Sequence, residues 1–84
     1  MVFKVLVEKK AGKQIERLNG DIRYRIIATL KELEKGFSAK LDIKKLKGTK
    51  NHYRIRVGDY RILFALESNV TYVYDISHRK NVYK

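Results

Sequence analysis

The stretch HYRIRVGDYRIL, from His52 to Leu63, constrains the fold more than any other part of the chain. Apolar and polar side chains alternate on both sides of its central Gly-Asp pair, which is the pattern of two strands joined by a two-residue turn. Gly58 can supply the positive φ that such a turn requires. The sequence therefore predicts an antiparallel hairpin with one apolar face and one arginine face. The opposed pairs are Tyr53 and Phe64, Ile55 and Ile62, and Arg56 and Arg61.

A further strand, VTYVYDIS, is predicted from Val70 to Ser77, after a turn at Ser68 and Asn69. We expect a loop of three residues at this turn, because a loop of two would place Ile62 opposite Asp75. The expected neighbours are Ile62 with Ile76 and Phe64 with Tyr74 on the core face, and Asp75 and Ser77 on the arginine face.

The first half of the chain predicts one strand followed by two helices. Residues 2–8, VFKVLVE, are rich in valine and typical of a strand. Apolar residues then recur at helical spacing in two groups that Asn19-Gly20 separates, and Gly36 follows as a stop. The two groups are Ala11, Ile15 and Leu18, and then Ile22, Ile26, Leu30 and Leu33. We expect residues 37–51 to form a loop with a short strand or turn.

These elements predict a single α+β domain over residues 1–84, with an antiparallel helix pair on one face of the sheet and a basic, open face on the other. The N-terminus lacks the layout of a signal peptide, and no stretch approaches the roughly 18 apolar residues of a membrane span. We therefore expect a soluble, cytoplasmic protein. With no Cys and only two His, the chain offers no metal-ligand set, and no cofactor is expected.

The positive charge is concentrated in two segments. Of a formal charge of +11, residues 38–61 supply +6, from eight basic and two acidic side chains, and residues 76–84 supply +3. Such a field attracts a polyanion and releases its counterions, so nucleic acid is the leading partner. An acidic protein, an anionic membrane or a merely soluble, lysine-rich surface would also fit the charge alone.

Three guanidinium groups gather on one face of the predicted hairpin, from Arg54, Arg56 and Arg61. Arg56 and Arg61 oppose each other across the ladder and should repel by an amount on the order of several tenths of a kcal/mol. A nucleic-acid backbone would relieve this repulsion, because guanidinium groups match phosphate oxygens bidentately. Tyr83, beyond the last strand, fits either a packing anchor or a base-stacking or catalytic role.

Two segments resemble a known family: LKGTKNHYRIRVGDYRILFAL, from Leu46 to Leu66, and ISHRKNVYK, from Ile76 to Lys84. They resemble the RelE/ParE superfamily of toxins from type II toxin–antitoxin pairs, and its RelE branch in particular, including archaeal members. This branch consists of mRNA interferases, which cut the codon in the ribosomal A site without a metal. The resemblance implies a RelB-like antitoxin, the ribosome and mRNA as partners, with no membrane and no small-molecule cofactor.

The resemblance also implies roles for individual residues. Arg61 matches the family's phosphate-stabilising arginine, Arg79 the arginine at the end of the last strand, and Tyr83 the tyrosine that stacks on the substrate base. Arg54 and Arg56 stand where the family places basic residues of the active face. The residues that we expect to bind RNA are Arg54, Lys44, Lys45, Lys47, Lys50 and Lys80.

The expected reaction is attack of a ribose 2′-OH on the adjacent phosphate, which leaves a 2′,3′-cyclic phosphate and a 5′-OH. Arg56 stands where a family member uses lysine, and arginine does not give up its proton at neutral pH. His78 is the nearby side chain whose ordinary pKa suits proton transfer, so we expect it to act as base or acid. Two other functions stay open: a ParE-like inhibitor of DNA gyrase without nuclease activity, and a non-catalytic basic RNA-binding domain.

Overall fold

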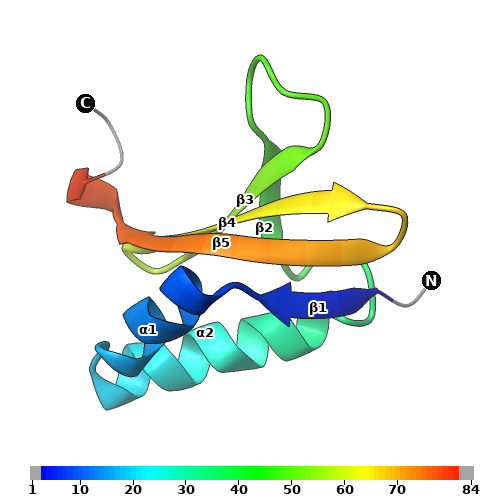
Figure 1. Ribbon diagram of the computed structural model, residues 1–84. Coiled ribbons are helices and arrows are strands. Elements are labelled where there is room, and N and C mark those ends of the chain that lie inside the picture. Colours follow the sequence, from blue (N-terminus) through cyan, green and yellow to red (C-terminus); the bar gives the residue numbers. More distant parts are fainter. Residues whose placement is uncertain (1–2, 82–84) are drawn as a thin grey trace.

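Two helices lie against one face of a five-stranded sheet in the computed structural model, which describes residues 3–81 (Figure 1). The elements are β1 (Lys4–Val7), α1 (Lys9–Glu16), α2 (Gly20–Leu33), β2 (Asp42–Lys45), β3 (His52–Val57), β4 (Tyr60–Glu67), β5 (Val70–His78) and a 3₁₀ turn (Arg79–Asn81). The strand order is β1-β5-β4-β3-β2, and β1 runs parallel to β5 while the other neighbours are antiparallel. The predicted α+β fold is thus confirmed.

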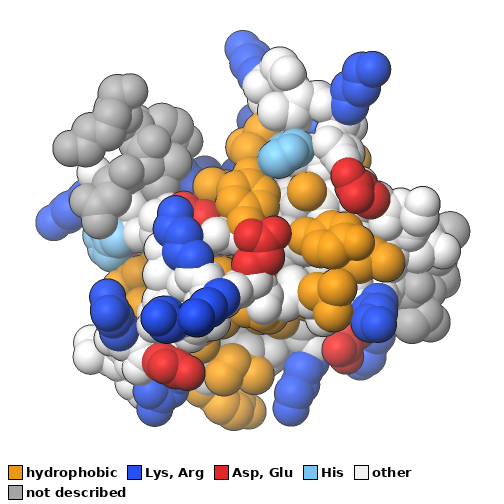
Figure 2. All heavy atoms as spheres, in the orientation of Figure 1, with side chains coloured by type: hydrophobic (Ala, Val, Ile, Leu, Met, Phe, Trp, Pro, Cys, Tyr) orange, Lys and Arg blue, Asp and Glu red, His pale blue; other side chains and the backbone are white. Residues whose placement is uncertain are grey.

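The segment between α2 and β3, which we expected to be a loop with a short strand or turn, contributes the edge strand β2. The connection from β2 to β3 projects away from the helices, as the green loop at the top of Figure 1 shows. Figure 2 shows Lys and Arg side chains at the tip of this loop and around the helices below. Among residues 3–81, neither helix is long and apolar enough to cross a membrane.

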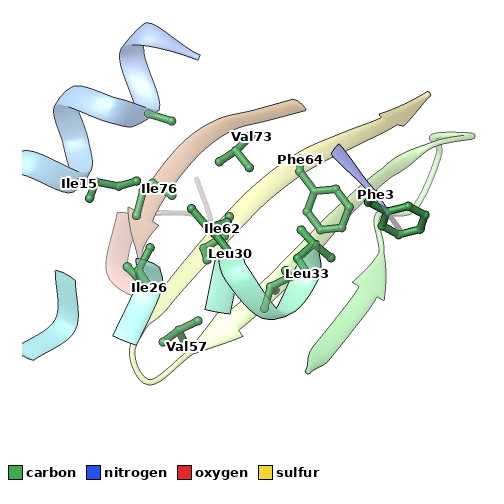
Figure 3. Close-up of a cluster of buried hydrophobic side chains, with 12 residues drawn as sticks. Phe3, Ile15, Ile26, Leu30, Leu33, Val57, Ile62, Phe64, Val73 and Ile76 are labelled. Carbon is green, nitrogen blue, oxygen red and sulfur yellow. The ribbon is translucent and has the colours of Figure 1, made fainter. Parts of the chain in front are cut away.

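The core lies between the helices and the sheet (Figure 3). Ile26, Leu30 and Leu33 of α2 are buried, as their helical spacing predicts, and α1 adds Ala11 and Ile15. Burying one side chain of this size stabilises a fold by about 1.5–3 kcal/mol. The residues that the sheet contributes are Ile55, Val57, Ile62, Phe64, Val73 and Ile76, with Phe3 before β1.

The hairpin of β3 and β4 has the predicted register, with Ile55 opposite Ile62 and Arg56 opposite Arg61. Gly58 adopts a φ of +59°, the left-handed conformation that the two-residue turn demands. The apolar face of this hairpin packs on α2, and the arginine face stays open on the other side of the sheet.

The pairing of β4 with β5 corrects one prediction. Ser68 and Asn69 form a two-residue turn with φ values of 48° and 67°, and the register shifts by one residue between Leu63 and Phe64. Ile62 still faces Ile76, as expected, but Phe64 faces Val73 instead of Tyr74. A β-bulge therefore restores the apolar face that we attributed to a three-residue loop. Tyr74 is the extra residue, and it leaves the core.

Candidate functional site

The open face of the sheet carries a row of polar side chains across four strands. Arg56 of β3 opposes Arg61 of β4, and Arg61 opposes Ser77 of β5. At the edge of the sheet, Asp42 of β2 opposes Arg56. The predicted arginine face is therefore present, and β2 adds a carboxylate to it.

A cavity of about 150 Å³ at one end of this row brings three predicted site residues together. Arg56, Arg61 and Arg79 all line it, beside the Gly58–Tyr60 end of the hairpin. Arg56 and Arg79 expose 51% and 65% of their side chains, whereas Nε and Nη1 of Arg61 are buried. Two exposed guanidinium groups thus lie beside a third that is largely buried in the sheet, and we call the cavity that these three line the arginine cavity.

Asp59 places Arg79 at this cavity. The backbone N–H of Arg79 donates to the carbonyl oxygen of Asp59 at 2.7 Å, and the Asp59 carboxylate lies 3.8 Å from Arg79 Nε. The 3₁₀ turn that follows β5 therefore folds back onto the hairpin tip. This contact brings Arg79, which is distant in sequence, to the cavity that Arg56 and Arg61 of the hairpin also line.

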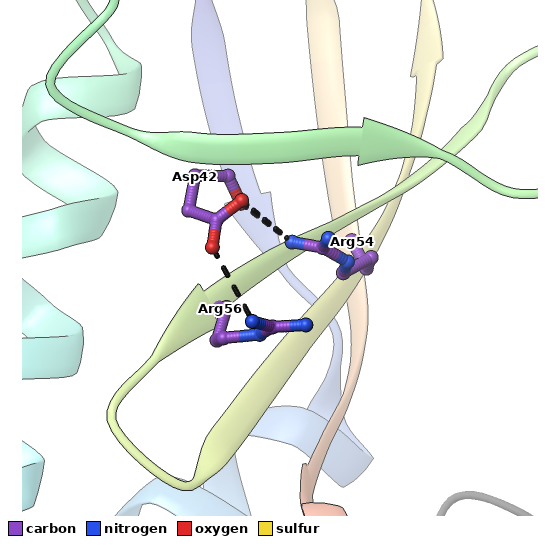
Figure 4. A network of polar contacts seen from close by, with 3 residues as sticks. All are labelled: Asp42, Arg54 and Arg56. Carbon is purple, nitrogen blue, oxygen red and sulfur yellow. Dashed lines mark hydrogen bonds and ion pairs between the residues drawn. The ribbon is translucent and has the colours of Figure 1, made fainter.

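Asp42 holds the two arginines of β3 (Figure 4). Arg54 Nη1 donates to Asp42 Oδ1 at 3.0 Å and to its carbonyl oxygen at 2.9 Å, while Arg56 Nε lies 3.8 Å from Oδ2. The hydrogen bond from Arg54 lowers the pKa of Asp42 below its ordinary value of 3.8, and the charges of Arg54 and Arg56 add to this effect. Arg54 is only 13% exposed, so it is tied to β2, whereas Arg56 remains available to a ligand.

The structure separates His78 from the arginines. His78 opposes Tyr60 in the ladder, on the same face as Ile62 and Ile76, and its ring contacts the Tyr60 ring edge-on at 5.0 Å. It lines a cavity of about 670 Å³ on the helix side of the sheet, together with Asp21. The alternation that buries Ile76 also directs His78 to the helix side, a signal already present in the sequence.

Asp75 has the expected place in the ladder, opposite Leu63, but its carboxylate turns to α1. It accepts a hydrogen bond from Gln14 Nε2 at 2.9 Å and lies 3.4 Å from Lys10 Nζ. Gln14 also accepts a hydrogen bond from the backbone N–H of Ile76 at 2.7 Å, so α1 covers the part of β5 that lies beyond its pairing with β1. Asp42, which the sequence argument did not single out, is the carboxylate that pairs with the β3 arginines.

The predicted RNA-binding lysines are all exposed but do not share one face. Lys44 opposes Arg54 on the open face, whereas Lys45 opposes Tyr53 and lies on the helix side. Lys47 and Lys50 belong to the projecting β2–β3 loop, and Lys80 to the 3₁₀ turn. Tyr83 lies outside the described residues. Within residues 3–81, no three His, Asp or Glu side chains gather as a possible metal site.

A second polar pair on the open face was missed by the sequence argument. His52 Nδ1 lies 3.0 Å from the hydroxyl of Tyr74, which the β-bulge directs to this face. Burial raises the pKa of Tyr74, and the charges of Asp75 and Glu8 raise it further. No sequence signal marks this pair, because it depends on the bulge.

A second basic surface, also not singled out, lies on α1. Lys9 and Lys13 of α1 and its C-cap residue Arg17 are exposed and recur at a spacing of four residues, so they share one side of the helix. This surface lies on the helix side of the sheet, away from the arginine cavity.

Comparisons with known proteins agree with one another. Residues 5–83 match the family described as the ParE toxin of the type II toxin–antitoxin system parDE. The chain is 41% identical over 84 residues to Toxin RelE3 of Methanocaldococcus jannaschii, covering 96% of each. It superimposes with a TM-score of 0.82 on the toxin–antitoxin complex RelB-RelE from Methanococcus jannaschii, at 38% identity over 94% of this chain and 95% of that one. The RelE-RelB complex from Pyrococcus horikoshii OT3 gives a TM-score of 0.82 at 26% identity, covering 98% and 100%.

Proposed function

The chain belongs to the ParE toxin family of type II toxin–antitoxin systems and is a RelE-like toxin, and from this premise we propose that it cuts mRNA in the ribosomal A site. The observation that carries the proposal is the arginine cavity, which Arg56, Arg61 and Arg79 line together. Three guanidinium groups around one small cavity create a strongly positive potential and offer donors in the geometry that phosphate oxygens accept.

In the proposed reaction, the 2′-oxygen of a ribose forms a bond to the adjacent phosphorus while the bond from phosphorus to the 5′-oxygen breaks. The 2′-hydroxyl gives its proton to water and the leaving 5′-oxygen takes one up from water, so the products are a 2′,3′-cyclic phosphate and a 5′-OH. The phosphorane gains negative charge on the way, and Arg56, Arg61 and Arg79 stabilise it. Guanidinium groups keep their protons, so the cavity supplies charge and alignment rather than a base. Tyr83 remains the residue that we propose to stack on the substrate base. The ring of His78 packs against Tyr60 on the helix side of the sheet, away from the arginine cavity.

We further propose a cognate antitoxin of the RelB kind, since the similar toxins of Methanococcus jannaschii and Pyrococcus horikoshii are found in complexes with RelB. The ribosome and mRNA are the other proposed partners, the reaction needs no metal, and the toxin acts in the cytoplasm. The net charge of +11 supports partners that are acidic or are nucleic acids.

Primer extension on a model mRNA with programmed ribosomes tests this function. The wild type should produce breaks at the A-site codon, and Arg61→Ala should slow them by about 100-fold or more, the usual cost of one preorganised donor at a developing charge. Arg23→Ala removes an equal charge from α2, outside the arginine cavity, and should cut like the wild type. Equal rates for all three proteins would refute the role of the cavity.

A ParE-like action on DNA gyrase is the second candidate, because the matching family carries the ParE name. Expression of the toxin separates the two functions by which process fails first. Loss of DNA supercoiling while mRNA stays intact on the ribosomes would replace the nuclease by a gyrase inhibitor.

A further inference from the structure

A second hollow meets the arginine cavity at the hairpin tip. It has a volume of about 340 Å³ and lies between α2 and the strands β2 and β3. Arg56 and Gly58 line both hollows, so the two share a wall. Tyr24 and Arg25 of α2 form the far side of the second hollow, and we call it the α2 groove.

Tyr24 presents an aromatic ring to solvent in this groove. Its exposed fraction is 75%, whereas the other exposed large hydrophobic side chains of residues 3–81 reach at most 43%. It lies beside the stripe of Ile26, Leu30 and Leu33 that builds the core, so the fold does not need its ring for packing. An exposed aromatic face next to a cationic site is the usual platform for an unpaired base.

Arg25 brings a further cation to the hairpin tip. A methyl group added at Gly58 would lie 3.3 Å from Arg25 Nη1, so the guanidinium rests against the bare backbone of the turn. Within residues 3–81, the structure shows no ion pair for Arg25. The groove thus combines a ring and a guanidinium group with Arg56 at its border.

We propose that the α2 groove binds the first mRNA nucleotide on the 3′ side of the A-site codon, with its base stacked on Tyr24 and its phosphate on Arg25. This inference rests on the proposed nuclease function. The strand would cross the hairpin tip beside Gly58, where Arg25 lies against the bare backbone, and Arg56, which lines both hollows, would contact the phosphates on both sides. The 3′ side is assigned because the codon on the 5′ side is paired with tRNA in the P site.

Single-turnover cleavage on programmed ribosomes tests the groove with two mRNAs, one that ends at the A-site codon and one that continues beyond it. With the longer mRNA, Tyr24→Ala should raise the half-saturating toxin concentration by about tenfold, since stacking contributes about 1–3 kcal/mol per base. The maximal rate should hold. With the truncated mRNA, Tyr24→Ala should match the wild type. Tyr24→Phe keeps the ring and should match the wild type on both.

A second pair of variants tests whether the positive charge of Arg25 contributes to RNA binding in the α2 groove. Arg25→Ala should weaken the use of the longer mRNA, whereas Arg23→Ala, on the opposite side of the same helix, should not. Equal losses for both variants, or equal losses of Tyr24→Ala on both mRNAs, would overturn the groove as an RNA site. The proposal would also be overturned if Tyr24→Ala impaired only the binding of the antitoxin, because the α2 groove would then be the site of a protein partner.

Fluorescence anisotropy with a labelled single-stranded RNA keeps the two proposals distinguishable. If the wild type does not cut mRNA on ribosomes, the proposed function fails. The groove then stands only if the wild type binds this RNA and Tyr24→Ala weakens the binding while Tyr24→Phe preserves it. If the wild type cuts and Tyr24→Ala is indistinguishable from it in both assays, the groove fails and the function stands.

Discussion

At the scale of single residues, the crowded arginines are separated into different roles by the acids beside them. Asp42 ties Arg54 to β2 and touches Arg56 only loosely, and Asp59 draws Arg79 to the hairpin tip. The repulsion across the ladder is thus partly relieved within the chain before any ligand binds. Exposed pairs of this kind contribute little to stability, so we expect their main effect to be on where the guanidinium groups lie.

Asp42→Asn should make stability less dependent on acid pH. The folded-state pKa of Asp42 lies below its ordinary value of 3.8, so its ion pairs stabilise the fold above that pH, and the contribution disappears as the pH falls through the lowered pKa. Urea unfolding should show a less stable variant at neutral pH and no difference in strong acid. Asp21→Asn removes an equal charge from α2 as the control. A variant as stable as the wild type at neutral pH would show that these pairs contribute nothing.

His78→Ala should lower the melting temperature and leave mRNA cleavage close to the wild-type rate. The reason is that its ring packs on Tyr60, on the side of the sheet away from Arg56 and Arg61. Thermal unfolding and single-turnover cleavage measure the two effects. Cleavage slowed as strongly as by Arg61→Ala would restore His78 as the proton-transfer group.

At the scale of elements, the strand registers that the sequence could predict are those fixed by the residues of a turn and by the alternation of side chains between the two faces of the sheet. The β3–β4 register was predictable, because a glycine-containing two-residue turn fixes every pair. The β4–β5 bulge was not, because a longer loop preserves the same apolar face at Ile62 and Ile76. Asp42 was missed since β2 is a four-residue edge strand whose pairing is not encoded locally. Arg79 was identified through the family resemblance, and only the fold places it beside Asp59.

Gly58→Ala should destabilise the protein by about 1–2 kcal/mol, because the residue has a left-handed φ of +59° and alanine pays the steric cost of that conformation. The added methyl group would also press on Arg25 at 3.3 Å. Gly20→Ala is the matched control: it lies in α2 with open space around it and should stabilise the protein by about 0.5–1 kcal/mol. Denaturant unfolding measures both, and equal signs would contradict the turn argument.

At the scale of the whole molecule, exposed cations of residues 3–81 lie on both sides of the sheet. The arginine cavity belongs to the open face, and the exposed cations of α1 belong to the helix side. The long-range attraction of a polyanion depends on the cations of both sides, whereas a direct phosphate contact depends on the single residue that makes it. Salt dependence can separate the two effects.

Arg79→Ala should reduce the slope of log affinity against log salt for single-stranded RNA by about 0.7, the value of one phosphate contact. Arg17→Ala removes the same charge from the C-cap of α1 and should leave both the affinity and the slope close to the wild-type values, because it contacts no phosphate in the proposed complex. Titrations at several salt concentrations give both slopes. A slope that falls equally in the two variants would mean that the RNA is held by the general field alone.

The parallel pairing of β1 with β5 also sets an order of assembly. β1 is the first strand to be synthesised, yet its partner is the last strand, with Lys4 opposite Val70. Closing so long a stretch of chain makes this contact a late one in folding. Arg79 follows β5, so the arginine cavity can form only after β5 has paired with β4. A growing chain would therefore lack the arginine cavity until β5 and Arg79 have been synthesised and have left the ribosome.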